Sequence, residues 1–436
     1  MADQGPPGAP DLLGGLLAAS HLMSWRDLPG AVRTYAARAG LEDALIYLAD
    51  LQERLLVLLP DAAPGGTGPG TGPGAGAGSG ADAELRIDAT VAGRAFQLGR
   101  VLSQGPGGVE GGHQWWLPLL NGTERLGVLR VTTAGDDGAT AGRMRLLATA
   151  VALLVVSKRD SSDAHARLVR TREMNVAAEM QWNLTPPQTY ADGQVVICGV
   201  MEPAYEIGGD AFDYALADDV LHLSVFDAMG HDTSAGMTAN LAVATSRNNR
   251  RHGMDLARTS EAIEEVLLGE FRRERYVTAV LADLNTRTGR LTWVNRGHHP
   301  PVVIRGGRWS ALLHCPPGHP MGTDLGLATT VCHEQLEPGD RLVLYTDGIT
   351  EARNPDGLQF GLDGFMDFLI RHHSDGLPVP ETLRRLTHAI LDHHRERLAD
   401  DATVVLAEWL GPDRRTGEVE AIVGLPDGVV PGRVSR

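Results

Sequence analysis

The sequence predicts an α+β protein with at least two domains. The chain has 436 residues, and a typical domain takes roughly 100–200 residues. Short apolar runs that are typical of strands alternate with amphipathic runs that are typical of helices, so both kinds of element are expected. In the C-terminal half, neighbouring strand candidates are separated by short turns such as residues 286–290. Such turns favour antiparallel pairing over a doubly wound parallel sheet.

The composition excludes several classes of function. The chain has 55 Asp and Glu against 39 Lys and Arg, a formal net charge of −16, whereas a nucleic-acid partner needs a clustered basic face. Three cysteines, Cys198, Cys315 and Cys332, are too few for a disulfide framework or a zinc cluster, so we expect a reducing, cytoplasmic location. The N-terminus has no secretion signal, and no uncharged apolar run reaches the ~20 residues that span a bilayer. Neither a nucleic acid nor a membrane is an expected partner.

The first domain is expected over residues 21–140. Residues 1–20 are rich in Gly, Pro and Ala and are expected to be disordered, and residues 64–80 form a Gly/Pro-rich insertion that is expected to be flexible. Asn121-Gly122 is a hairpin signal between two apolar runs, although we expect the connection to be longer than two residues. Strands are expected at 85–87, 91–98, 115–120 and 126–132.

Residues 141–187 predict a long linker helix. The segment has almost no Gly or Pro before Pro186-Pro187, which ends it. Its first half is apolar at helical spacing, at Met144, Leu147 and Val151, and its second half is charged. A helix of this kind joins two domains or pairs with its own copy, so we expect a homodimer through it.

The second domain is expected over residues 190–410, followed by a flexible tail at 411–436. Strands are expected at 195–200, 220–226, 276–284, 291–295, 302–305, 341–345 and 403–410. Amphipathic helices are expected at 233–251, 258–273, 362–373 and 380–398.

Four segments of this domain carry aspartates beside strand ends. Asp227 ends one strand candidate and Asp347 follows another, while Asp400 and Asp401 precede the last one. Asp210 stands behind two glycines. Each segment taken alone is better explained by a solvated acidic turn.

Together, the aspartates favour a metal site. Carboxylates at adjacent strand ends repel one another unless a cation lies between them. Oxygen ligands without a His/Cys cluster select Mg²⁺ or Mn²⁺ over zinc. Two such ions turn a shared water into a nucleophile at neutral pH, which suits hydrolysis of a phosphate ester.

Five motifs, in their order and spacing, resemble those of the SpoIIE/RsbU-type PP2C-like (PPM) serine/threonine protein phosphatases. They are GGDAFDY (208–214), FDAMGHD (226–232), VNRGHHPP (294–301), YTDGITEARN (345–354) and DDATVV (400–405). The resemblance implies an αββα sandwich, two antiparallel sheets between helix layers, with two Mn²⁺ or Mg²⁺ ions at one edge. It also implies hydrolysis of phosphoserine or phosphothreonine by a metal-bridging water, commonly on a STAS-type anti-anti-sigma protein in bacterial partner-switching signalling.

The resemblance also assigns roles to residues. It implies that Asp227 bridges both metals and that the Ala228 carbonyl binds the second one. Asp347 and Asp400 would hold the first metal. Asp210 would contribute to the second metal's shell, through water.

The chain departs from the family pattern at two places. Where the family has GHG, this chain has Gly230-His231-Asp232, and we expect Asp232 to cap the helix that follows. Arg296 replaces a small residue; a surface ion pair is the expected use, and contact with the substrate phosphate is the alternative. His231 could protonate the leaving serine oxygen or be an ordinary loop residue. Asp401 matches the family and could organise a loop or touch metal.

The N-terminal elements resemble a GAF domain, which implies a sensory input from a small molecule or a protein. Two other functions stay open for the whole chain. One is a catalytically inactive phosphatase-fold scaffold with a regulatory role. The other is a metal-dependent phosphodiesterase for a nucleotide, although the sequence has no P-loop motif.

Overall fold

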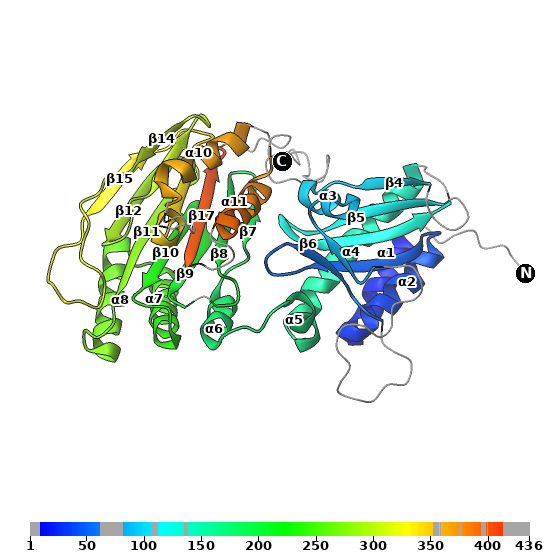
Figure 1. The fold of residues 1–436 in the computed structure, drawn as a ribbon, viewed down its shortest axis with the longest axis horizontal. Coiled ribbons are helices and arrows are strands. Elements are labelled where there is room, and N and C mark those ends of the chain that lie inside the picture. The colour runs from blue at the N-terminus through cyan, green and yellow to red at the C-terminus, as the bar shows by residue number, and fades with distance from the viewer. Residues whose placement is uncertain are drawn as a thin grey trace, which may run out of the picture. The chain divides into compact units, whose positions relative to one another are not determined.

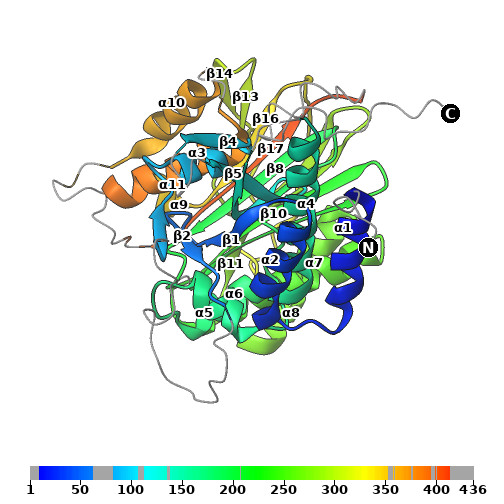
Figure 2. The same ribbon diagram turned by 90° about the vertical axis from the view of Figure 1, so that its right-hand side faces the viewer.

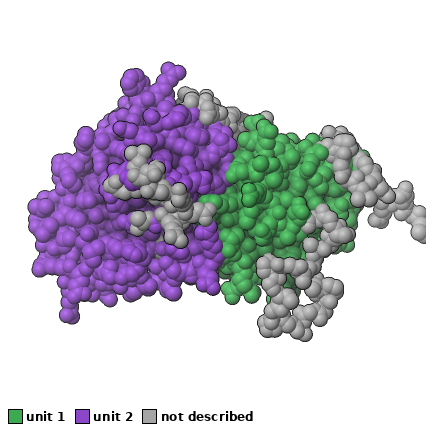
Figure 3. Space-filling model, in the orientation of Figure 1, with its two compact units in different colours: residues 1–171, 424–429 green, residues 172–423, 430–436 purple. Residues whose placement is uncertain are grey.

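The computed structural model describes residues 9–61, 82–106, 112–134, 138–206, 208–351, 357, 359–374, 377–393, 398 and 400–412. The chain forms two compact units that divide between Thr171 and Arg172 (Figure 3). All of the expected insertion at 64–80 and most of the expected tail at 411–436 lie outside the described residues. The predicted disorder of residues 1–20 is wrong for its second half, because residues 9–19 form a helix and Leu16 is fully buried.

Unit 1 is a six-stranded antiparallel sheet with helices on both faces (Figure 1). Its strands are β1 (Glu42–Ala49), β2 (Leu55–Leu58), β3 (Glu84–Arg86), β4 (Leu102–Pro106), β5 (His113–Asn121) and β6 (Glu124–Thr133), in the order β3-β2-β1-β6-β5-β4. Its first helices are α1 (Ala9–Ala19), α2 (Leu28–Arg38) and α3 (Val91–Leu98). Alternation along β1 sends Ile46 and Leu48 to the core under α1 and α2, and Tyr47 to the core under α3. The GAF-like character of this unit stays a prediction.

One predicted strand of unit 1 is a helix. Residues 91–98 form α3, because Thr90 accepts a hydrogen bond from the Gly93 N–H at its start and Gly99, at φ 62°, ends it. The hairpin itself is confirmed, but its expected length is wrong. Asn121 pairs with Glu124, so β5 and β6 are joined by two residues only.

The predicted linker helix is three helices. They are α4 (Gly138–Arg159), α5 (Asp163–Val169) and α6 (Val176–Leu184), which Asn175 caps by accepting the Ala178 N–H. Met144, Leu147 and Val151 of α4 are buried in the core of unit 1, so its apolar stripe is used within the chain and does not argue for pairing of two copies. Thr140–Arg159 is the one candidate membrane span among the described residues, and half of it is buried. Packing therefore explains its apolar composition.

Unit 2 is the predicted αββα sandwich (Figures 1 and 2). Its strands are β7 (Thr189–Ala191), β8 (Val195–Glu202), β9 (Asp210–Ala217), β10 (Val220–Ala228), β11 (Val277–Asn285), β12 (Arg290–Arg296), β13 (Val302–Arg305), β14 (Trp309–Leu312), β15 (Val331–Gln335), β16 (Arg341–Tyr345) and β17 (Ala402–Trp409). Its further helices are α7 (Thr233–Arg251), α8 (Leu256–Phe271), α9 (Asp347–Thr350), α10 (Gly361–Ser374) and α11 (Val379–His393). The sheets have the orders β15-β12-β11-β10-β9 and β14-β13-β16-β17-β8-β7, and every strand pairing is antiparallel.

Two apolar layers hold the sandwich together. Between the sheets lie the inward side chains of alternate residues, for example Leu221, Leu223 and Val225 of β10. The intervening Phe226 packs with Ala239 of α7 and other residues in the second layer, between the five-stranded sheet and its helices. α11 packs on β8 of the other sheet, with α10 beside it.

Two features of unit 2 differ from expectation. No strand was expected behind the two glycines, but β9 is a full strand in which Asp213 is buried and pairs with Arg247 and Arg250 of α7. The cysteines were expected to be unpaired, but Cys315 and Cys332 form a disulfide that joins the segment after β14 to β15. Cys198 is free and buried.

Two glycines in helices of unit 1 should respond oppositely to alanine. A Cβ at Gly93 would lie 1.7 Å from the Ile87 carbonyl oxygen, whereas a Cβ at Gly142 meets nothing within 4 Å. We expect Gly93→Ala to lower the free energy of unfolding by about 1–3 kcal/mol, as overpacking does. Gly142→Ala should raise it by up to ~1 kcal/mol, because alanine favours helix. Denaturant unfolding of the two variants would check this, and a stabilised Gly93→Ala would contradict the packing of α3.

Candidate metal centre

Three inward-facing polar residues end the apolar rows of the five-stranded sheet. Phe212 and Tyr214 of β9 point between the sheets, so Asp210 shares their face. The same argument places Asp227 beyond Val225 in β10 and Thr278 before Val280 in β11. Asp227 lies directly opposite Asp210 on one side and Thr278 on the other. One edge of the sheet therefore carries two neighbouring carboxylates.

The six-stranded sheet brings its own polar residues to the same edge. Thr346 follows β16, and Asp347 opens the short helix α9. Asp400 and Asp401 immediately precede β17, which pairs with β16. Antiparallel pairing places the end of β16 beside the start of β17, so these residues meet.

Hydrogen bonds tie the two sheets together at this edge. Asp401 Oδ2 accepts the backbone N–H groups of Gly208 at 2.9 Å, Gly209 at 2.6 Å and Asp210 at 3.2 Å. The Thr346 hydroxyl donates to Asp210 Oδ2 at 2.7 Å and accepts the Thr403 N–H at 2.9 Å. Asp401 therefore organises the loop before β9, which is one of the two roles expected for it.

The glycines of the motifs allow close approach of the backbones. A Cβ at Gly348 would lie 1.9 Å from the Asp401 carbonyl oxygen, and a Cβ at Gly209 would lie 2.4 Å from the Ala228 carbonyl oxygen. Any larger residue would push these chains apart. The Ala228 N–H also donates to the Gly209 carbonyl at 3.1 Å, which fixes the strand end that follows Asp227.

The electrostatics show which carboxylates interact. Burial, followed by the charges of Asp347, Asp400 and Asp401, raises the pKa of Asp227 to about 7. Burial, then Asp401 and Asp227, raises the pKa of Asp210 well above its ordinary value. Burial and then Asp400 raise the pKa of Asp347. The predicted site residues thus lie within reach of one another's charge.

The donors fit a hard divalent cation in kind. They are carboxylate oxygens, the ligands that Mg²⁺ and Mn²⁺ prefer. These carboxylates repel one another, and a cation between them would remove that repulsion. Within the described residues, no group of three or more Asp, Glu, His or Cys side chains is arranged so that it could hold a metal ion.

The first departure from the family pattern, Asp232, stabilises the start of a helix. Asp232 caps α7, since its Oδ1 accepts the Ala235 N–H at 2.8 Å, as expected. Its other oxygen accepts a hydrogen bond from Arg275 at 3.0 Å, and Arg275 also donates to the Met229 carbonyl at 3.0 Å. His231 is exposed.

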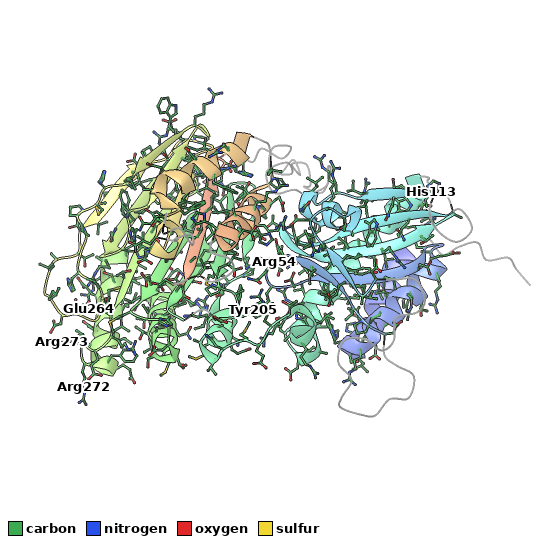
Figure 4. All side chains as sticks on the ribbon, in the orientation of Figure 1. Arg54, His113, Tyr205, Glu264, Arg272 and Arg273 are labelled. Atoms are coloured by element: carbon green, nitrogen blue, oxygen red, sulfur yellow. A yellow bond between two sulfur atoms is a disulfide. The ribbon has the colours of Figure 1, made fainter. Side chains whose placement is uncertain are left out.

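The second departure, Arg296, is buried rather than on the surface. The residue is 2% exposed, so the expected surface ion pair is wrong. Its guanidinium donates to Glu264 at 2.9 Å and to the His319 carbonyl at 3.0 Å; Glu264 is labelled on α8 in Figure 4. Glu264 also accepts the Gly322 and Asp324 N–H groups at 3.1 and 2.7 Å. Arg296 therefore anchors the segment after β14, which local sequence could not reveal.

Neutralising Asp227 should stabilise the metal-free protein in a pH-dependent way. Because its pKa is raised, the native state binds more protons than the unfolded state between pH ~4 and ~7, so stability falls as the pH rises through this window. In EDTA, Asp227→Asn should raise the thermal midpoint at pH 8 by on the order of 2–4 °C, or about 1 kcal/mol, and by less at pH 5.

The control for this experiment is Asp218→Asn, in the exposed turn between β9 and β10 at φ 54°. Its effect should be the same at both pH values. An equal effect of Asp227→Asn at pH 5 and pH 8 would contradict the carboxylate cluster.

Comparison with known proteins finds a family and several relatives that are similar to the C-terminal part of the chain. Residues 217–410 match the family described as Stage II sporulation protein E (SpoIIE). The chain is 24% identical over 252 residues to phosphoserine phosphatase RsbP of Bacillus subtilis (strain 168). The aligned region covers 56% of this chain and 59% of RsbP. It is 20% identical over 240 residues to phosphoserine phosphatase RsbU of the same organism, over 54% of this chain and 69% of RsbU.

A solved structure, the SiaA-PP2C domain of Pseudomonas aeruginosa, is 20% identical with a TM-score of 0.47, over 53% of this chain and 94% of that one. The chain spans about three fifths of the length of RsbP. These similarities concern about half of the chain. The part of the chain that contains residues 217–410 is a SpoIIE-type PP2C phosphatase domain.

Proposed function

We propose that the chain is a metal-dependent protein phosphatase that hydrolyses phosphoserine or phosphothreonine. The observation that carries this proposal is the meeting of four carboxylates from both sheets, Asp210, Asp227, Asp347 and Asp400, with the pKa values of the first three raised. Such a cluster is costly unless cations occupy it. The relatives named phosphoserine phosphatases support the same chemistry.

Each residue has a proposed role. Asp227 would contact both ions, with the Ala228 carbonyl on the second; Asp347 and Asp400 would hold the first, and Asp210 would act on the second through water. When bound, Mn²⁺ or Mg²⁺ supplies a water nucleophile at neutral pH and neutralises charge on the phosphoryl group.

The chain's own hydrogen bonds prepare this arrangement. Asp401 fixes the loop of Gly208 and Gly209, where backbone could approach a substrate. Thr346 orients Asp210 by donating to one of its carboxylate oxygens. These bonds involve no ion, so they fix Asp210 and the loop before it in the metal-free chain.

The proposed substrate is a phosphorylated STAS-type protein in bacterial partner-switching signalling, in the cytoplasm. Unit 1 would be the sensor, with a small molecule or a protein as its input. These assignments rest on the resemblance of the motifs and of the N-terminal elements.

Two aspartates from different sheets provide the test of the activity. Full-length protein should hydrolyse p-nitrophenyl phosphate only with added Mn²⁺ or Mg²⁺. Asp227→Ala and Asp347→Ala should each lower kcat/KM by at least ~100-fold, a loss of about 2.7 kcal/mol in transition-state stabilisation. Asp218→Asn is the control and should keep wild-type kinetics. Activity that survives both substitutions would refute the assignment.

The scaffold alternative makes a different prediction for metal binding. A folded, full-length protein that takes up no Mn²⁺ at millimolar concentration in calorimetry would favour a scaffold. Nucleotide substrates in the same assay would test the phosphodiesterase alternative.

Regulation by unit 1 can be tested by removing it. Because α4 belongs to the core of unit 1, the cut should fall at the boundary between Thr171 and Arg172. We expect removal of residues 1–171 to change kcat by several-fold, since α6 packs against α7, the helix that follows Asp227. Kinetics equal to those of the full chain, measured on truncated protein that circular dichroism shows to be folded, would remove unit 1 from the mechanism.

A further inference from the structure

His298 lies immediately behind the carboxylate cluster, and its backbone is fixed at two points. Its N–H donates to Asn295 Oδ1 at 2.8 Å, and its carbonyl accepts from Asn295 Nδ2 at 2.9 Å. Gly297, at φ 72°, makes the turn between them. The His298 residue is 7% exposed. Its ring is therefore held in one place and largely hidden from water.

Both ring nitrogens are hydrogen-bonded. Nε2 lies 2.9 Å from the Tyr345 carbonyl oxygen, and Nδ1 lies 2.7 Å from the Thr278 hydroxyl oxygen. Burial lowers the pKa of His298 to about 4, so the ring is neutral and carries one proton. A carbonyl can only accept, so Nε2 carries that proton and Nδ1 accepts from Thr278.

The two partners lead to two different metal-site aspartates. Thr278 stands directly opposite Asp227 in the β10–β11 ladder. Because its one hydroxyl proton goes to His298 Nδ1, Thr278 is tied to Asp227 through the strand pairing. Tyr345 ends β16, two residues before Asp347. A single imidazole thus connects the five-stranded sheet beside Asp227 to the six-stranded sheet beside Asp347.

This link differs in kind from the others at the same edge. Asp401 and Thr346 both bind the segment of Gly208, Gly209 and Asp210. The His298 link instead reaches Thr278, opposite Asp227, and the Tyr345 carbonyl, two residues before Asp347. Groups that orient metal ligands in this way tune the affinity of a site by 10–100-fold.

We propose that His298 is a positioning residue that sets the spacing of Asp227 and Asp347 through Thr278 and the Tyr345 carbonyl. The inference rests on the proposed function, because the spacing matters for the two ions. Removing either hydrogen bond should weaken metal binding before it weakens folding.

Two substitutions separate the two arms of the link. In His298→Asn the side-chain amide reaches only as far as Nδ1 and can serve Thr278, whereas in His298→Gln it reaches the position of Nε2 and can serve Tyr345. We expect each variant to raise the Kd for Mn²⁺, measured by calorimetry on the full chain, by about 10-fold or more. At saturating Mn²⁺, kcat on p-nitrophenyl phosphate should recover to within about 3-fold of wild type.

Thr278→Val tests the same link without changing the size of the side chain. It removes the hydroxyl, so the Kd for Mn²⁺ should rise similarly. Both substitutions remove the same hydrogen bond, the one between Thr278 and His298. The double variant Thr278→Val/His298→Gln should therefore lose less Mn²⁺ affinity than the product of the two single losses. This variant also keeps the test valid if the His298 variants do not fold.

The control is His222→Asn. His222 lies in the same β10–β11 ladder, where its Nδ1 is 2.6 Å from Asp283, five residues or about 16 Å from Asp227. The His222→Asn variant should leave the Kd for Mn²⁺ unchanged.

The outcomes separate the inference from the proposed function. Wild-type protein that binds no Mn²⁺ would overturn both. If the wild type binds Mn²⁺ and the His298 and Thr278 variants bind it equally well, with only a lower thermal midpoint, then His298 is merely structural and this inference alone fails.

Discussion

Repulsion between carboxylates at the meeting edge of two sheets is the constraint on which unit 2 depends. Burial and like charges raise the pKa values of Asp210, Asp227 and Asp347, so the site destabilises its own metal-free state. The chain holds these groups together by neutral donors, namely three backbone N–H groups on Asp401 and the Thr346 hydroxyl on Asp210. Such donors support negative charge without a competing cation.

The sandwich explains why residues so far apart in sequence can form this edge. In each sheet the side chains alternate, so that an apolar row fills the space between the sheets and its next member falls at the rim. Leu223 and Val225 lead to Asp227, and Leu342 and Leu344 lead to Thr346. The same packing that stabilises the core therefore aims the polar groups, and a one-residue shift of register would turn them outward.

Most of the elements of unit 2 could be predicted because their patterns are local. The period-2 runs of β10 and β16 and the period-3.6 run of α7 are visible without any partner. β9 could not be predicted, since its Asp213 is acceptable in a strand only because Arg247 and Arg250 reach it from α7. Nor could the burial of Arg296, whose partner Glu264 lies on α8, 32 residues away. Contacts between distant segments decided both cases.

The residues of the candidate site could be predicted from local motifs, but the contacts that hold them could not. The motifs predict Asp210, Asp227, Asp347 and Asp400 as site residues, and in the structure their charges act on one another. What the motifs did not reveal is how they are held. Asp401 acts through three backbone groups whose direction depends on the loop at Gly208 and Gly209, and His298 acts through a neighbour in another strand.

The two departures from the family pattern bear on whether the site is active. Asp232 and Arg296 were the reasons to consider an inactive scaffold. Asp232 caps the helix that follows Asp227, and Arg296 joins Glu264 in holding the segment around Gly322. Both side chains are engaged in hydrogen bonds that order loops next to the strand ends. The Asp232 carboxylate is held by Ala235 and Arg275, and the Arg296 cation is held by Glu264. The departures therefore give no physical reason for the carboxylate cluster to refuse a metal ion.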